Sequence, residues 1–130
     1  MLRNLDEILQ LICQKDSRYK EDSYEFVLEA LTFTQKKFRE KRHVSGKELL
    51  EGIKILLMKE FGPFTLTVLK HWGVERTDDF GNIVFNLVEQ KVLSKTEEDS
   101  IDSFRNAFDF EVVFDRGYKQ GLEKKISKMR

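Results

Sequence analysis

Apolar residues recur at intervals of three and four along the first part of the chain, which is the spacing of one face of an α-helix. The first stripe predicts a helix over residues 4–14 and consists of Leu5, Ile8, Leu9 and Ile12. A second stripe predicts a longer helix over residues 22–41, with the Asp22 side chain as its N-cap. Phe26 and Phe33 lie off this stripe, so we expect the second helix to be buried on more than one side.

The third apolar stripe is preceded by a helix-start signal. Ser45 and Glu48 stand three residues apart, as in a capping box, where each side chain accepts a hydrogen bond from the backbone of the other residue. Gly62 and Pro63 then interrupt the apolar pattern. The sequence therefore predicts a third helix between Ser45 and Gly62.

Two shorter stripes separated by a glycine corner follow at residues 63–90. The first predicts a helix over residues 63–72, with Pro63 in its first turn and Gly73 at a left-handed exit. Thr77 is expected to cap the next helix, at residues 78–90, whose apolar stripe is Phe80, Ile83, Val84, Leu87 and Val88. The pattern predicts a helix-turn-helix.

Residues 91–114 allow two interpretations. The segments 91–95 and 108–114 have the composition and alternation of short strands. Between them, Thr96 and Asp99 form a helix-start signal, and Ile101, Phe104 and Phe108 are helically spaced. We expect either a two-stranded β ribbon with a helical insertion or continued helix to the end of the chain.

The order of helix, turn, helix and ribbon resembles a winged helix over about residues 46–114. The predicted fold is mainly α, with five to six helices, a winged-helix-like C-terminal half and, in the first interpretation, a small ribbon. With 130 residues, 40% of them hydrophobic, the chain can bury one sizeable core. We expect a single compact domain at residues 1–115 and a basic tail at 116–130, either helical or frayed.

Membrane insertion and export are not indicated. The longest apolar run, residues 55–58, is far shorter than the roughly 20 residues of a membrane span. Asp6 and Glu7 interrupt the N-terminal segment where a signal peptide would be apolar. The single Cys13 cannot form an internal disulfide and is interpreted as a core residue. We therefore expect a cytoplasmic protein.

The net charge is zero, but the charges are segregated along the chain. Residues 35–44 hold five basic residues and one acid, residues 75–115 hold four and eleven, and residues 116–130 hold six and one. Candidate contacts for nucleic acid or other anions are Lys36, Lys37, Arg39, Lys41, Arg42, Lys47, Lys124, Lys125, Lys128 and Arg130. A candidate acidic face for protein contacts consists of Asp78, Asp79, Glu97, Glu98 and Asp99.

Base reading by the predicted helix-turn-helix is disfavoured by charge. The second helix would place its first turn in the major groove, and that turn carries Asp78 and Asp79. Two carboxylates would be repelled by the phosphates, and Arg76 alone cannot offset them. The corner is interpreted as packing geometry.

No catalytic, metal or cofactor motif is found. His43 and His71 lie on different predicted elements and outside any metal-ligand spacing. The segment Ser45-Gly46-Lys47 lacks the upstream glycine and trailing hydroxyl of a P-loop. No serine stands in a Gly-x-Ser-x-Gly elbow, and the acids near residue 98 lack EF-hand spacing. We expect no enzyme activity and no cofactor.

At "DSYEFVLEAL", "HVSGKELLEGI" and "WGVERTDDFGNIVFNLV", the chain resembles a small bacterial family found among planctomycete and verrucomicrobial lineages. The resemblance covers most of residues 22–114. The family carries no established activity, so the resemblance implies a bacterial cytoplasmic origin and transfers no functional residue.

The sequence thus leads to two functional hypotheses. The first is a non-enzymatic protein-interaction or regulatory module that uses its acidic face, with a partner of unknown identity. The alternative is a nucleic-acid-binding protein that uses the basic segment at 35–44 and the tail. The oligomeric state is not predicted.

Overall fold

The computed structural model describes residues 4–38, 44–94 and 101–116. Its α-helices are α1 (Leu5–Lys15), α2 (Glu21–Phe38), α3 (Gly46–Phe61), α4 (Thr65–Trp72) and α5 (Thr77–Glu89). Three shorter helical turns are η1 (Gly62–Phe64), η2 (Asp102–Phe104) and η3 (Glu111–Arg116). The expected mainly α fold is confirmed.

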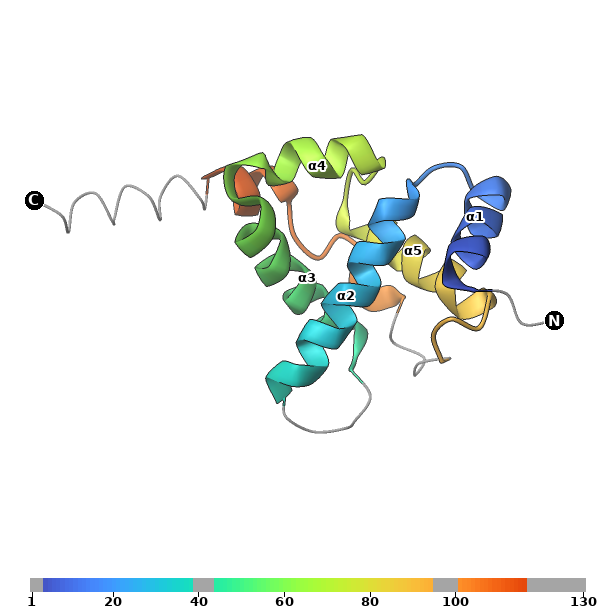
Figure 1. Cartoon of the computed structure of the whole chain (residues 1–130). Helices are drawn as coiled ribbons and strands as arrows, with labels where there is room; N and C mark the ends of the chain where they lie inside the picture. The colour runs from blue at the N-terminus through green and yellow to red at the C-terminus, as the bar shows by residue number, and fades with distance from the viewer. Residues whose placement is uncertain (1–3, 39–43, 95–100, 117–130) are drawn as a thin grey trace, which may run out of the picture.

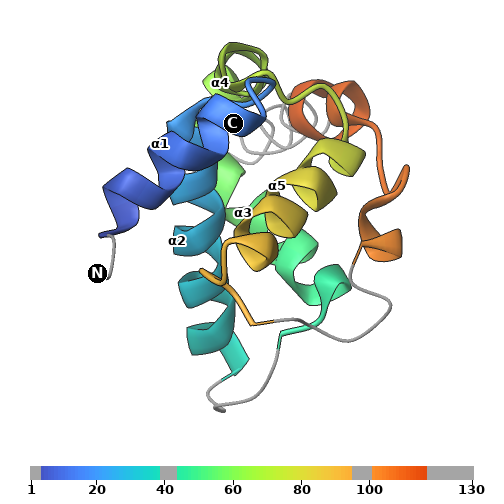
Figure 2. The ribbon, with the colours of Figure 1, turned by 90° about the vertical axis from the view of Figure 1, so that its right-hand side faces the viewer.

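The helices α2 and α3 run in opposite directions and form the central pair (Figure 1). Helix α4 crosses over the beginning of α2 and the end of α3, while α1 packs against α2 (Figure 1). Helix α5 lies beside α2, and residues 101–116 pass along its other side to reach α4 (Figure 2). The helices therefore pack around one common core.

All five helices contribute buried apolar side chains to this core. Leu9, Val27, Ile53, Leu69 and Ile83 are each essentially inaccessible to water. Fully burying such a side chain stabilises the fold by roughly 1.5–3 kcal/mol. The periodic stripes therefore identified most of the buried positions, with Leu5, which is 43% exposed, as an exception.

Two helix starts differ from the predicted ones. Helix α2 begins at Glu21, so Asp22 lies inside the first turn and is not the N-cap. Helix α5 begins at Thr77, and Arg76 takes the N-cap position that was expected for Thr77. The expected Ser45–Glu48 capping box at the start of α3 is confirmed.

The capping contacts of α5 come from Asp79, which lies three residues inside the helix. Its carboxylate accepts hydrogen bonds from the backbone N–H groups of Glu75, at 2.8 Å, and Arg76, at 3.1 Å. The Thr77 hydroxyl instead accepts a 3.0 Å hydrogen bond from the backbone of Ala107. Since Asp79 already supplies the cap, the threonine side chain is free to hold the C-terminal segment.

Two glycines are required by the packing. At Gly52, a Cβ atom would lie 1.8 Å from the hydroxyl oxygen of Thr34, so glycine allows α2 and α3 to approach closely. Gly73 has φ of +84°, and a Cβ there would lie 2.2 Å from the Arg18 carbonyl oxygen. The predicted left-handed exit of α4 at Gly73 is confirmed.

The C-terminal segment contains no strand in its described part. Residues 91–94 form a turn after α5, and Phe110 to Arg116 is helical. Phe110 and Phe114, spaced four apart, are buried, whereas Val112 between them is 49% exposed. The strand interpretation of residues 108–114 is therefore wrong, because the burial follows helical rather than alternating spacing.

The two predicted helices and the corner between them are found as α4, residues 73–76 and α5. No β-strand occurs in residues 4–38, 44–94 and 101–116, so the ribbon and the winged-helix resemblance are not confirmed. The proposed helix start at Thr96 and most of the basic tail lie outside the described residues.

Candidate functional site

A pocket of about 560 Å³ lies where α4 crosses the ends of α2 and α3. This is within the usual size range of ligand pockets. Helix α2 contributes Asp22, Glu25, Phe26 and Glu29, α3 contributes Glu60 and Phe61, and α4 contributes Thr67, Val68, His71 and Trp72. We call it the α2–α4 pocket.

Three aromatic rings form the apolar part of the α2–α4 pocket. The ring centroid of Phe26 lies 5.2 Å from that of Trp72 and 5.9 Å from that of Phe61. Phe61 and Trp72 meet edge to face at 5.7 Å. Phe26 and Trp72 are buried and only Phe61 is partly exposed, so the ring cluster forms the packed floor of the pocket.

The other side of the pocket lining is acidic. Asp22, Glu25 and Glu29 follow one another along α2, and Glu60 faces them from α3. A hydrogen bond to Glu29, burial, and the negative charge of Glu29 raise the pKa of Glu60. The lining thus combines four carboxyl groups with aromatic rings and contains no lysine or arginine.

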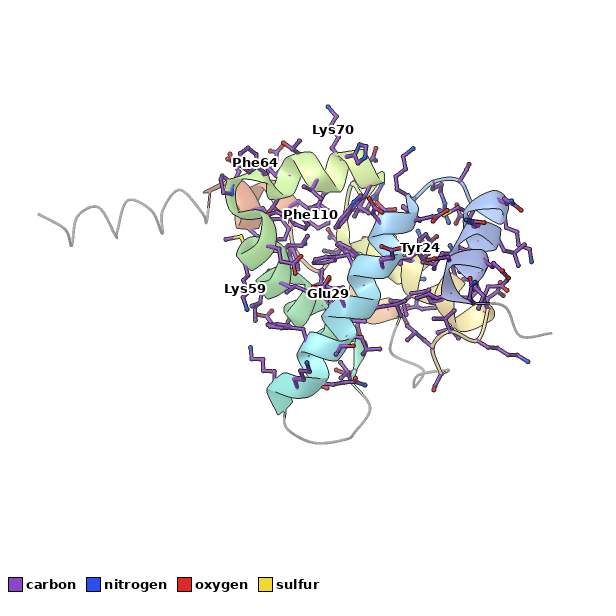
Figure 3. All side chains as sticks on the ribbon, viewed as in Figure 1. Tyr24, Glu29, Lys59, Phe64, Lys70 and Phe110 are labelled. Atoms are coloured by element: carbon purple, nitrogen blue, oxygen red, sulfur yellow. The ribbon has the colours of Figure 1, made fainter. Side chains whose placement is uncertain are left out.

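These acids have no basic partner one helical turn away, and only Lys59, next to Glu60 in the sequence, acts against the rise of the Glu60 pKa. None of the four has a lysine or arginine three or four residues away within its own helix. Glu25 and Glu29 are one helical turn apart, and such like-charge pairs destabilise a helix by roughly 0.2–0.5 kcal/mol. Figure 3 shows Glu29 midway along α2, whereas Lys70 projects from α4 away from the body of the protein. The arrangement favours a positively charged occupant.

Two residues of the predicted acidic face serve internal contacts. The Asp78 carboxylate accepts a 2.8 Å hydrogen bond from the backbone of Asn106. Asp79 caps α5 and accepts a 2.5 Å hydrogen bond from the hydroxyl of Tyr19. The remaining predicted members, Glu97, Glu98 and Asp99, lie outside the described residues. In the described part of this face, both carboxylates are therefore engaged in contacts within the fold.

The predicted basic contacts are only partly described. Lys36 and Lys37 are exposed in the last turn of α2, and Lys47 is exposed in the first turn of α3. The last turn of α2 and the first turn of α3 lie at the same end of the antiparallel central pair (Figure 1), so the three lysines belong to that end. Outside the described residues are Arg39, Lys41, Arg42, Lys124, Lys125, Lys128 and Arg130.

A separate polar network joins the α1–α2 corner to α5. The amide of Asn86 donates to the Asp16 carboxylate at 3.0 Å and to the Tyr24 hydroxyl at 2.9 Å. The amide of Asn82 donates to the Tyr19 hydroxyl at 2.9 Å. Burial is the main cause that raises the pKa of both tyrosines to about 12. These groups satisfy one another, so the network fixes the packing of the corner.

The thiol of Cys13 lies half-buried beside the core, 3.6 Å from the carbonyl oxygen of Tyr19. Burial raises the pKa of this thiol, which disfavours the nucleophilic thiolate. His71 is exposed at the α2–α4 pocket, while His43 lies outside the described residues. In the described part of the chain, no three His, Cys, Asp or Glu side chains are grouped to hold a metal ion.

No family model, curated protein or solved structure matches the chain. Among the described residues, no helix is both long and apolar enough to cross a membrane. The chemistry of the α2–α4 pocket is therefore the feature that bears on function.

Sequence reasoning missed the α2–α4 pocket, although part of its signal was visible. Asp22, Glu25 and Glu29 occupy one face of the predicted second helix, and Phe26 lies on the same face. Glu60 could not be added from the sequence, because only the packing of α3 and α4 against α2 brings it to this face.

Proposed function

We propose that this protein is a non-enzymatic interaction module that binds a positively charged segment of a partner protein in the α2–α4 pocket. The observation that carries the proposal is a lining of aromatic rings and carboxylates without lysine or arginine. A basic segment with apolar residues complements both parts, since its charges face the acids and its apolar atoms can meet the partly exposed Phe61 and Val68. A cytoplasmic location is part of this proposal.

The α2–α4 pocket replaces the predicted acidic face as the proposed contact surface. Asp78 and Asp79 are occupied with the C-terminal segment and with the capping of α5. Glu29 and Glu60, by contrast, are exposed at the mouth of the pocket. Exposed carboxylates can meet a partner without breaking contacts that hold the fold together.

The second candidate function is nucleic-acid binding. It is favoured by the exposure of Lys36, Lys37 and Lys47 at one end of the central helix pair. Lysines at this end would contact phosphates, and the α4–α5 corner would serve packing alone. Binding of this kind weakens steeply as the salt concentration rises.

Fluorescence anisotropy with a labelled synthetic peptide of arginine, leucine and glycine tests the proposal. A counterpart with glutamate in place of arginine, and labelled DNA and RNA, complete the set of probes. The full chain should bind the basic peptide and not the acidic one. The double variant Glu25→Gln/Glu29→Gln should bind it about tenfold more weakly, because two complementary charges are lost.

The matched control is Glu75→Gln/Glu89→Gln, which changes the net charge equally at exposed positions outside the pocket. It should leave the affinity within about twofold. Equal loss in both double variants would mean that net charge, and not the pocket, attracts the peptide. Binding of nucleic acid that is lost in Lys36→Gln/Lys37→Gln, without peptide binding, would favour the second candidate.

A further inference from the structure

An exposed apolar surface lies where η1, which leads into α4, packs against η3. Phe64 in η1 is 68% exposed and Val112 in η3 is 49% exposed. Among the described residues, these are the two most exposed large apolar side chains. Figure 3 shows Phe64 at the beginning of α4, on the outside of the molecule. We call the surface formed by these two residues the η1–η3 surface, and neither residue lines the α2–α4 pocket.

The exposure of Phe64 has a local cause. The next residue, Thr65, is buried, and its hydroxyl donates to the carbonyl oxygen of Gly62 at 2.8 Å, which fixes the start of α4. Phe64 takes the N-cap position of α4 and makes no capping hydrogen bond, whereas serine, threonine, asparagine or aspartate would accept one. The phenylalanine thus neither caps the helix nor joins the core, which leaves its ring available for a contact outside the fold.

The border of the η1–η3 surface along η3 is acidic. Asp109 and Glu111 are exposed beside Val112. Residues 108–115 contain three acids and no lysine or arginine. A segment that covers this surface should therefore combine apolar with basic residues.

The chain itself contains a segment of this chemistry directly after η3. Residues 117–130, which lie outside the described part, hold five basic residues and one acid. Leu122, Ile126 and Met129 are four and three residues apart, which is the spacing of one helical face. We propose that residues 122–130 of a second copy of this chain cover the η1–η3 surface, and that the first copy covers the surface of the second in the same way.

The position of η3 favours a second copy over the tail of the same chain. Helix η3 ends at Arg116, and Val112 stands four residues earlier. Only five residues separate Arg116 from Leu122, so the chain would have to reverse within them to bring Leu122 back over Val112. So short a loop is costly to close, whereas a segment from a second copy meets no such constraint. Reciprocal exchange also gives two equal contacts, as in a two-fold symmetric dimer.

Analytical ultracentrifugation of the full chain tests the proposal. Concentrations from about 5 to about 500 µM cover a dissociation constant on the order of 100 µM, and the full chain should form dimers within this range. The surface variant Phe64→Ser/Val112→Ser and the tail variant Leu122→Ser/Ile126→Ser should each weaken the dimer at least about tenfold, because both contacts lose apolar residues on one side. Serine suits the N-cap position of Phe64, so the surface variant should keep its fold, which circular dichroism checks.

The matched control is Leu5→Ser/Phe85→Ser, which removes apolar side chains that are 43% and 45% exposed on α1 and α5. It should dimerise like the wild type. Nuclear magnetic resonance then separates tail exchange from direct pairing of two surfaces. Isotope-labelled tail variant is mixed with unlabelled surface variant, so that an intact surface is present only on the labelled chain and an intact tail only on the unlabelled one. Chemical shifts should change at Phe64 and Val112 of the labelled chain.

Four results would overturn the proposal. The full chain could remain monomeric over the whole concentration range, or the tail variant could dimerise as well as the wild type. The control could lose the dimer as the surface variant does, which would indicate general apolar association. In the mixture of variants, the chemical shifts of Phe64 and Val112 could stay unchanged, which would exclude a contact between this surface and the tail of another copy.

Discussion

Asp16 shows how one side chain can organise a corner of the fold. Its carboxylate accepts hydrogen bonds from the Arg18 guanidinium at 2.9 and 2.8 Å and from Asn86 at 3.0 Å. The Arg18 contacts are the main reason that the pKa of Asp16 lies well below its usual range. Since Asn86 belongs to α5, this one carboxylate connects the end of α1 to a distant helix.

Replacing Asp16 by asparagine should lower the free energy of unfolding at neutral pH by about 1–3 kcal/mol, because hydrogen bonds to a charged group are lost. A carboxyl with a lowered folded pKa contributes stability above its unfolded pKa of about 3.9 and loses it as the pH falls. Urea denaturation at neutral pH and at about pH 3 should therefore show a smaller acid-induced loss for Asp16→Asn than for the wild type.

The matched control for Asp16→Asn is Asp102→Asn. The Asp102 side chain is 71% exposed and pairs with Arg105 at 3.5 Å. Exposed pairs contribute about 0–1 kcal/mol, so this change should have little effect at either pH. An Asp16→Asn variant with the same acid dependence as the wild type would show that the network does not depend on the charge.

Helices α4 and α5 end in the same backbone motif with different residues. After α4, Gly73 donates to the carbonyl oxygen of Lys70 at 3.1 Å and Val74 donates to that of Leu69 at 2.9 Å. After α5, the backbone N–H of Lys91 donates to the carbonyl oxygen of Val88 at 3.0 Å, and that of Val92 donates to the carbonyl oxygen of Leu87 at 2.9 Å. Both are Schellman motifs, but the left-handed position is glycine in one and Lys91, with φ of 61°, in the other.

Lys91→Gly should raise the free energy of unfolding by about 0.5–1 kcal/mol. The left-handed conformation costs a non-glycine residue about 1–2 kcal/mol, and glycine removes this cost. Part of the gain is lost because glycine also increases the conformational entropy of the unfolded chain. Thermal or urea unfolding measures the effect. Lys70→Gly is the matched control, since Lys70 is exposed inside α4. It should lower stability by about 1 kcal/mol. The same sign for both variants would contradict the argument from backbone conformation.

The helices were predictable where a local signal marks them. The Ser45–Glu48 pair and Gly73 act within a few residues, so their roles were visible in the sequence. The start of α5 was placed one residue too late, since Asp79 caps α5 from inside the helix, and Asp22, the expected N-cap of α2, lies inside its first turn. The secondary structure around Phe110 and Phe114 was ambiguous in the sequence, because two residues four apart lie on the same face of either a strand or a helix. Only tertiary contacts decide between them.

The site was less predictable than the helices for the same reason. The acids on α2 could be placed on one face from their spacing, but their relation to Glu60 depends on how α3 packs. The charge run at 75–115 suggested an acidic face, yet Asp78 and Asp79 bind backbone N–H groups. The distribution of charged residues along the sequence thus gives the net charge of a region, but it does not show which contacts the individual side chains make.

At the scale of the whole molecule, residues 101–116 complete the core. Phe104, Phe110 and Phe114 are buried. Phe104 packs so closely on α5 that a Cβ at Gly81 would lie 3.0 Å from it. Hydrogen bonds from the backbone of Asn106 and Ala107 fix the segment to the start of α5. The helices α1 to α5 alone would leave these surfaces in water.

A chain that ends at Ser94 should therefore lose cooperative thermal unfolding, whereas a chain that ends at Arg116 should retain it. Burial of three phenylalanines contributes about 1.5–3 kcal/mol each, which together is a large part of a typical stability of about 5–15 kcal/mol. Far-UV circular dichroism during heating distinguishes the two chains. If the shorter chain unfolds cooperatively at nearly the same melting temperature as the longer one, residues 101–116 are not required for a complete core.

A point variant tests the same contribution without removing the segment. Phe104→Ala should lower the free energy of unfolding by about 3–5 kcal/mol, because it leaves a cavity against α5. Phe64→Ala is the matched control, since Phe64 is 68% exposed and its truncation should change stability by less than about 0.5 kcal/mol. A large difference between these variants would show that Phe104, which lies far along the chain from the helices it covers, is part of the core against which α5 packs. Equal small effects would show that residues 101–116 lie against a core that is stable without them.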